Sequence, residues 1–116
     1  MSLKGQHIAT DDGSNNEVIY VKDLEYLLTE NRVKALNFSD IYIRYKKPSE
    51  RYNKADLNYK GIVAENVGNP KSKRYRMVDG SHRASRLVKQ HNRKRAYFYV
   101  ITKKEFLNNV ISQNNP

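Results

Sequence analysis

The sequence contains no cysteine and no tryptophan among its 116 residues. Without cysteine, the chain cannot form a disulfide, use a thiolate nucleophile or build a zinc site from sulfur ligands. Its apolar runs are only a few residues long, which argues against a membrane-spanning helix and against the apolar core of a secretory signal. We therefore expect a soluble, cytoplasmic (intracellular) protein with no membrane partner.

Acidic residues are scarce in one part of the chain. Residues 1–70 contain ten Lys or Arg and ten Asp or Glu, whereas residues 71–104 contain twelve Lys or Arg and a single acid, Asp79. The net charge of +10 therefore arises almost entirely from residues 71–104. Such a local excess is consistent with an anionic ligand and equally with a solubilising surface.

Length and patterning predict one small domain of the α+β class. Residues 1–16 are polar and predict a mobile N-terminal tail, which leaves 17–116 as the folded domain. Strands are predicted where β-branched and aromatic residues gather, at 17–21, 62–67, 74–78 and 96–101. The turn at 68–73 suggests that the second and third of these strands form a hairpin.

Other segments give weaker signals. Asp23 can cap a short helix that carries Leu24, Leu27 and Leu28 at helical spacing. This helix can run on through Val33 and Leu36 unless Asn31 interrupts it. Residues 38–45 alternate in polarity and favour a strand, and residues 46–59 predict a polar loop. A capping box at 102–105 opens a final helix, for which we predict an apolar stripe through the following residues: Phe106, Leu107, Val110 and Ile111.

The clearest local pattern lies at residues 75–91. Alternating residues up to Val78 predict a strand, Asp79-Gly80 predicts a tight turn, and apolar residues at helical spacing predict a helix over 81–91. A helix N-terminus presents N–H donors and a partial positive charge, so this turn is a candidate anion site. Together with the strand at 96–101, the pattern predicts a strand–helix–strand crossover with parallel pairing.

The run YRMVDGSHRASRL, residues 75–87, resembles the signature of the ParB/sulfiredoxin superfamily. The resemblance implies a mixed sheet with helices packed on it and a phosphate-binding site at the strand–turn–helix motif. In sulfiredoxins a reactive cysteine follows the glycine, whereas this chain has Ser81 there and no cysteine at all, which excludes that chemistry. Relatives that bind nucleoside triphosphates or transfer phosphate imply a nucleotide, ATP or CTP with Mg²⁺, as cofactor.

The motif residues have both functional and structural interpretations. Gly80 permits close approach of an anion or simply supplies a positive φ. Arg83 suits a phosphate bidentately, and the rest of the predicted phosphate or nucleotide site is Ser81, His82 and Arg86. Asp79 and His82 are the candidate catalytic residues, as a metal ligand or base and as a proton shuttle. Capping or packing is the structural alternative for both. No residues with metal-ligand spacing are apparent.

Two further functions remain open from the sequence. The connector at 93–95 and the aromatic strand that follows could bind DNA or RNA, with a ParB-like nuclease activity as one form; the candidate residues are Arg93, Lys94, Arg95 and Tyr97. Core packing is the structural alternative for the tyrosine. The third function is that of a non-enzymatic domain that uses its basic face to bind a protein partner.

Overall fold

The structure is a computed structural model, and it describes residues 6–8, 17–47, 49–55, 57–65 and 73–112. Its elements follow in chain order: β1 (Gln6–Ile8), β2 (Glu17–Tyr20), η1 (Val21–Leu27), η2 (Glu30–Arg32), β3 (Val33–Asn37), η3 (Phe38–Asp40), β4 (Ile41–Tyr42), α1 (Glu50–Asn53), β5 (Ile62–Glu65), β6 (Tyr75–Asp79), α2 (Ser81–Lys89), β7 (Arg95–Ile101), α3 (Lys103–Asn108) and β8 (Ile111–Ser112). The α+β class with a mixed sheet is confirmed.

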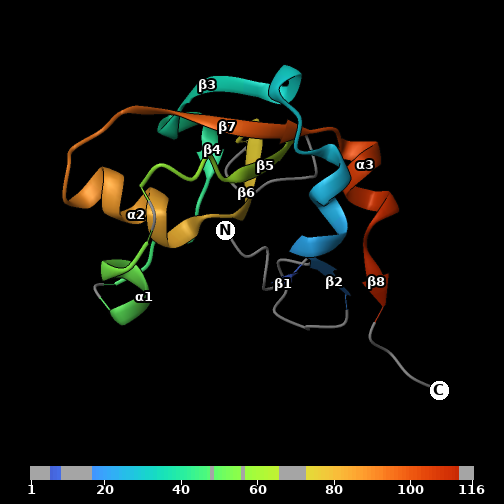
Figure 1. The fold of residues 1–116 in the computed structure, drawn as a ribbon, viewed down its shortest axis with the longest axis horizontal. Helices are drawn as coiled ribbons and strands as arrows, with labels where there is room; N and C mark the ends of the chain where they lie inside the picture. Colours follow the sequence, from blue (N-terminus) through green and yellow to red (C-terminus); the bar gives the residue numbers. More distant parts are fainter. Residues whose placement is uncertain (1–5, 9–16, 48, 56, 66–72, 113–116) are drawn as a thin grey trace.

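A five-stranded mixed sheet in the order β3-β7-β5-β6-β4 forms the centre of the domain. β5 is antiparallel to β6, as the predicted hairpin requires, and parallel to β7. A second, three-stranded sheet joins β1, β2 and β8. Figure 1 shows α1 and α2 together on one side of the molecule and η1 beside α3 on the other.

Two apolar clusters lie on the two faces of the large sheet. One contains Phe98, packed edge-on against Phe38 with ring centres 5.8 Å apart, and it includes Ala84 and Leu87 of α2. The other includes residues of η1, together with Phe106 of α3. β5 contributes to both, because its successive side chains point to opposite faces and are buried on each. Both faces of the sheet are therefore covered. Because β6 is a strand of this sheet and α2 packs on one face of it, the turn between them is held in place.

The predicted parallel crossover is wrong in its pairing. β6 and β7, which α2 connects, are not neighbours: β5 lies between them. Because β5 is antiparallel to β6 and parallel to β7, the two strands joined by α2 run in opposite directions. The sequence predicted that β6 would pair with β7, but β5, the hairpin partner of β6, pairs with β7 instead.

The predicted helix around Leu24 and Leu27 is the 3₁₀ helix η1, and its predicted extension through Val33 to Leu36 is wrong. The chain forms two short 3₁₀ helices and then the edge strand β3, which pairs with β7 over five residues. Tyr20, not Asp23, is the N-cap residue of η1. Backbone pairing with β7 and burial of Leu36 outweigh the helical spacing of the leucines.

Several boundaries differ from the sequence prediction. Within the predicted tail, residues 6–8 pair with β2, and the rest of 1–16 lies outside the described residues, as does most of the predicted turn at 68–73. The predicted strand at 38–45 is a 3₁₀ turn followed by the two-residue β4, and α1 lies within the predicted loop at 46–59. The capping box at Thr102 is confirmed, but α3 ends at Asn108 because Ile111 pairs with β2.

Glu105 links the capping box of α3 to η2. Arg32 donates two hydrogen bonds of 2.6 Å to its two carboxylate oxygens, and both side chains are partly buried. The Arg32 guanidinium holds the pKa of the Glu105 carboxyl below its ordinary value near 4.5. Because the folded state binds this proton less readily than the unfolded chain, the pair stabilises the fold above that value. The stabilisation is lost as the pH falls through the lowered pKa.

We predict that Glu105→Gln lowers the free energy of unfolding at pH 7 by about 1 kcal/mol, since glutamine keeps the cap but loses the ion pair. The difference from wild type should shrink towards zero in urea unfolding measured below pH 4. Glu50→Gln is the matched control, because its pair with Lys54 is highly exposed, and it should change stability little at either pH. An equal loss in both variants would contradict the prediction.

Candidate functional site

The strand–turn–helix predicted at 75–91 is present, with a glycine at its turn. β6 ends at Asp79, and Gly80 is the N-cap residue of α2 with φ +101° and ψ 20°. The N-cap residue is thus a glycine, which has no side chain for capping, and Asp79 lies one residue before the N-cap position. The first backbone bond of the helix runs from the Ala84 N–H to the Gly80 carbonyl. The N–H groups of residues 81–83 precede that bond at a helix start that carries no acid.

A second glycine, Gly61, lies against this turn at the entrance to β5. It also has a positive φ, +66°, and a Cβ on Gly80 would lie 3.2 Å from its Cα. A Cβ on Gly61 would in turn lie 3.1 Å from the Asp79 carbonyl oxygen. The two backbones therefore meet closely, and a Cβ at either position would press on the facing backbone. Sequence analysis missed Gly61, although a glycine directly before the strand that pairs with the motif strand was a usable signal.

Tyr59 packs beside Gly80 and donates a hydrogen bond to the acid of the motif. Its hydroxyl donates a 2.5 Å hydrogen bond to Oδ2 of Asp79. Burial, followed by this bond, raises the pKa of the Tyr59 hydroxyl well above its ordinary value, so the hydroxyl keeps its proton at physiological pH. No local pattern pointed to Tyr59, which lies twenty residues away in a segment predicted as a loop.

Arg83 is buried on the inner side of the turn, with 7 % of its surface exposed. Its Nε donates to the Leu57 carbonyl at 3.3 Å, and its guanidinium lies 5.4 Å from the Phe98 ring centre. It is close enough to Tyr59 to act against the rise of the tyrosine pKa. The sequence suggested that the Arg83 side chain lies beside the N–H groups of the helix start. In the structure its charge is instead buried between the Leu57 carbonyl and the Phe98 ring.

Arg86 faces the segment at 49–55 rather than the turn. Its Nη1 donates to the carbonyls of Asn53 at 3.0 Å and Ala55 at 3.4 Å, and its Nε donates to Gln90 at 2.7 Å. On the preceding residue, the buried Ser85 hydroxyl accepts from the Lys46 N–H and donates to the Ser81 carbonyl. Arg86 thus fastens α1 to α2, and its predicted part in anion binding stays a prediction.

Ser81 and His82 occupy the first turn of α2, and both are half-buried. With Gly80, they form the part of the motif at the open end of the helix. The structure therefore brings the predicted residues 79–83 together around one turn. Asp79 accepts a hydrogen bond from Tyr59 and Arg83 donates one to the Leu57 carbonyl, whereas the serine and the histidine are partly accessible to solvent. An anion at this end would meet backbone donors and a hydroxyl.

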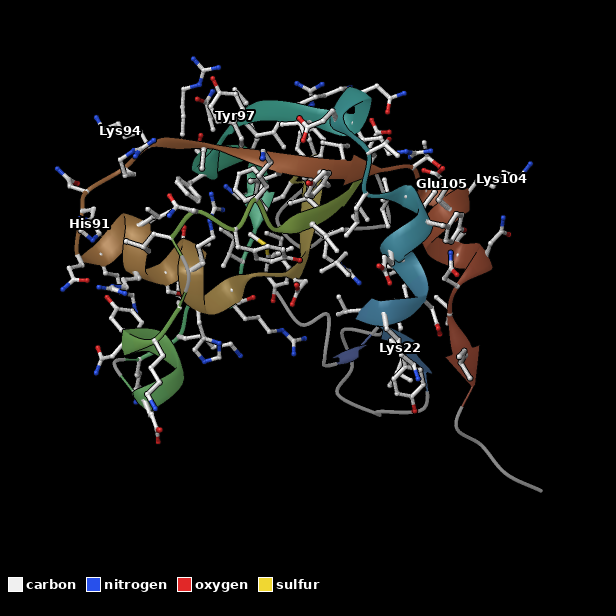
Figure 2. All side chains as sticks on the ribbon, in the orientation of Figure 1. Lys22, His91, Lys94, Tyr97, Lys104 and Glu105 are labelled. Carbon is white, nitrogen blue, oxygen red and sulfur yellow. The ribbon has the colours of Figure 1, made fainter. Side chains whose placement is uncertain are left out.

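The candidate nucleic-acid residues lie at the other end of α2. Arg93, Lys94 and Arg95 are exposed, and Tyr97 on β7 is 59 % exposed, so core packing is excluded as its role. A pocket of about 300 Å³ lies beside the connector and is lined by Asn37, Phe38, Ser39, Arg93 and Lys94. Figure 2 shows Lys94 and Tyr97 near the start of β7, and Lys104 beyond its end on α3.

No protein-family model, no curated protein and no solved structure matches this chain. Among the residues that the structure describes, no group of three or more His, Asp or Glu is arranged to hold a metal ion. Within the same residues, no helix is long and apolar enough to cross a membrane. The geometry of the site therefore carries the functional argument.

We predict that Gly80→Ala destabilises the fold by about 1–2 kcal/mol, because a side chain is strained at φ +101°. The new Cβ would also press on the Gly61 backbone. Thermal or urea unfolding measures the loss. Ser81→Ala, one residue into the helix, is the control and should change stability by less than about 0.5 kcal/mol. Equal stability of the two variants would show that the turn does not depend on its glycine.

We also predict that Tyr59 and Asp79 are energetically coupled. In a double-mutant cycle, Tyr59→Phe and Asp79→Asn should show a coupling energy of about 1 kcal/mol or more in the free energy of unfolding. The control cycle pairs Tyr59→Phe with Glu65→Gln at the other end of β5, and its effects should be additive. Additive effects in the first cycle would mean that the hydroxyl–carboxylate bond is absent in solution.

Proposed function

We propose that this protein is a ParB/sulfiredoxin-like domain that binds a nucleotide or another phosphate-bearing ligand at residues 79–83. The proposal is carried by one observation: the N-cap residue of α2 is a glycine, and the first turn of the helix contains no acid. Most helix starts are capped by Ser, Thr, Asp or Asn, whose oxygen uses the donors that an anion would need. Here the N-cap residue has no such oxygen, and the helix dipole favours an anion at this end.

The two glycines support close approach of a phosphate. At Gly61 and Gly80 a side chain would collide with the facing backbone, so the wall of the turn consists of main chain and the Tyr59 ring. Phosphate oxygens can approach such a wall closely enough to accept N–H hydrogen bonds. Ser81 adds a hydroxyl donor at the first helical position, and His82 adds a ring nitrogen.

The charges around the turn also favour an anion. The Asp79 carboxylate would repel a phosphate, but it already accepts the Tyr59 hydroxyl and lies beside the buried Arg83. Arg83 is held by the Leu57 carbonyl and the Phe98 ring, so its positive charge stays close to the turn. A fixed charge in a partly buried site acts more strongly on a ligand than the same charge in solvent.

A nucleoside triphosphate, ATP or CTP with Mg²⁺, is the ligand class that we propose first. The magnesium ion would come with the phosphates, and Asp79 is the motif's carboxylate ligand for it. Phosphoryl transfer or hydrolysis would use His82 or Asp79 as the proton acceptor. Two alternatives are a domain that binds phosphate without turnover and a domain that serves only as a protein-interaction module. The binding and product measurements below distinguish both from an enzyme.

Ser81→Asp tests the proposal, because the new carboxylate would occupy the position of the anion. An acid at the first helical position favours the helix by about 0.3–1 kcal/mol, so stability should be kept or raised. We expect the affinity for ATP, CTP, ADP or inorganic phosphate to fall at least about tenfold in calorimetry, with and without Mg²⁺. Product analysis in the same samples reports any turnover.

Asn31→Asp is the matched control, since it makes the same change in net charge on the exposed surface of η2. It should bind every ligand as the wild type does. Arg83→Ala, provided that circular dichroism shows a native fold, should also weaken binding. If no phosphate compound binds the wild type, or if Ser81→Asp binds as well as Asn31→Asp, the proposed function is wrong.

A further inference from the structure

The connector between α2 and β7 is a fixed part of the fold. The Arg93 N–H donates to the Leu87 carbonyl at 3.0 Å, and the Lys94 carbonyl accepts from the Phe38 N–H at 2.9 Å. Directly before them, Asn92 has a positive φ of 51°, a conformation that asparagine tolerates better than most residues. The basic side chains of 93–95 are therefore presented from a backbone tied to α2 on one side and to η3 on the other.

A hollow lies beside this connector, and its surroundings are positively charged. The pocket of about 300 Å³ is formed by Arg93 and Lys94 on one side and by residues 37–39 on the other. Lys73 reaches the same place, since its Nζ donates to the Ser39 carbonyl at 2.5 Å. Asp40, which is half-buried in η3, is the acid nearest in sequence to the pocket residues. The hollow thus has several cations around it, and its walls combine an aromatic residue with polar ones.

An exposed aromatic ring continues this surface along β7. Tyr97 is 59 % exposed and lies two residues after Arg95, so both side chains are on the same face of the strand. The residue paired with Tyr97 on the neighbouring edge strand β3 is Ala35, whose small side chain leaves the tyrosine ring largely uncovered. An uncovered tyrosine beside cations matches a platform on which a nucleobase stacks.

We propose that the surface formed by Asn37–Ser39, Arg93–Arg95 and Tyr97 binds single-stranded nucleic acid. The cations contact successive phosphates, one base stacks on Tyr97, and the pocket accepts a neighbouring base or sugar. A duplex would offer the phosphates but not the exposed base faces, which is why a single strand fits better. Both RNA and DNA have this chemistry, and the experiment below distinguishes them.

This surface is separate from the phosphate site. The turn at Gly80 and the connector lie at opposite ends of α2, whose nine residues span roughly 13 Å. The two sites share none of the residues that we vary. Failure of one proposal therefore leaves the other standing.

The test is fluorescence anisotropy of labelled 20-nucleotide oligo(dT), oligo(U) and a 20-base-pair duplex, titrated with the full chain over a range of salt concentrations. We expect Kd for a single strand to rise about tenfold or more in Tyr97→Ala and to change little in Tyr97→Phe, which keeps the stacking face. Lys94→Ala should also weaken binding, and it should reduce the salt slope by about 0.7, the value for one phosphate contact on a single strand.

Lys104→Ala is the matched control, because Lys104 is an equally exposed lysine on α3, past the far end of β7. It should bind as the wild type does. A lower Kd for oligo(U) than for oligo(dT), or the reverse, identifies the preferred nucleic acid. The proposal is overturned if Lys94→Ala and Lys104→Ala are indistinguishable, if Tyr97→Ala binds as well as Tyr97→Phe, or if the duplex binds as tightly as the single strands.

Discussion

The contact between the backbones of Gly61 and Gly80 is the constraint on which the rest of this site depends. It brings the entrance of β5 against the exit of β6, and both glycines need a positive φ to make the approach. Tyr59 then lies over the turn and reaches Asp79, while Arg83 extends behind it towards the Leu57 carbonyl. One short backbone contact thus sets the position of an acid, a tyrosine, a buried cation and the start of α2.

This constraint also explains how much of the site could be predicted. The strand, the turn and the helix at 75–91 follow from alternation, from a glycine and from helical spacing, all of which are local. Tyr59 and Gly61 come from a different segment, and only the hairpin between β5 and β6 brings them to the turn. The sequence predicted that hairpin, and the glycine directly before β5 was a usable signal for Gly61, but no local pattern indicated that Tyr59 would face the motif. Long-range register, rather than propensity, determined the missing half of the site.

The same limit accounts for the errors in the fold. Helical spacing of leucines between residues 24 and 36 was outweighed by the need of β7 for a partner on its outer edge, which β3 supplies. The pairing of β7 with β5 rather than with β6 likewise reflects a choice among strands, which local patterns cannot make. The capping box at Thr102 was predictable because it involves only residues three apart.

The twelve basic residues of 71–104 appeared in the sequence as one positive region, but the structure divides them by role. Arg76 and Arg83 are buried, and Lys73, Arg86 and Lys89 donate to backbone carbonyls that hold neighbouring segments in place. Arg86 and Lys89 also lie in the last turn of α2, where they complement its dipole. These five serve the fold first. The charged groups of the exposed connector residues 93–95 do not hold other segments in place; among them, Arg93 donates one hydrogen bond, to the Arg95 carbonyl. These eight basic residues therefore form two separate features: five cations that are buried or bonded to the backbone and hold the fold, and an exposed group at 93–95 whose positive charge is directed outward.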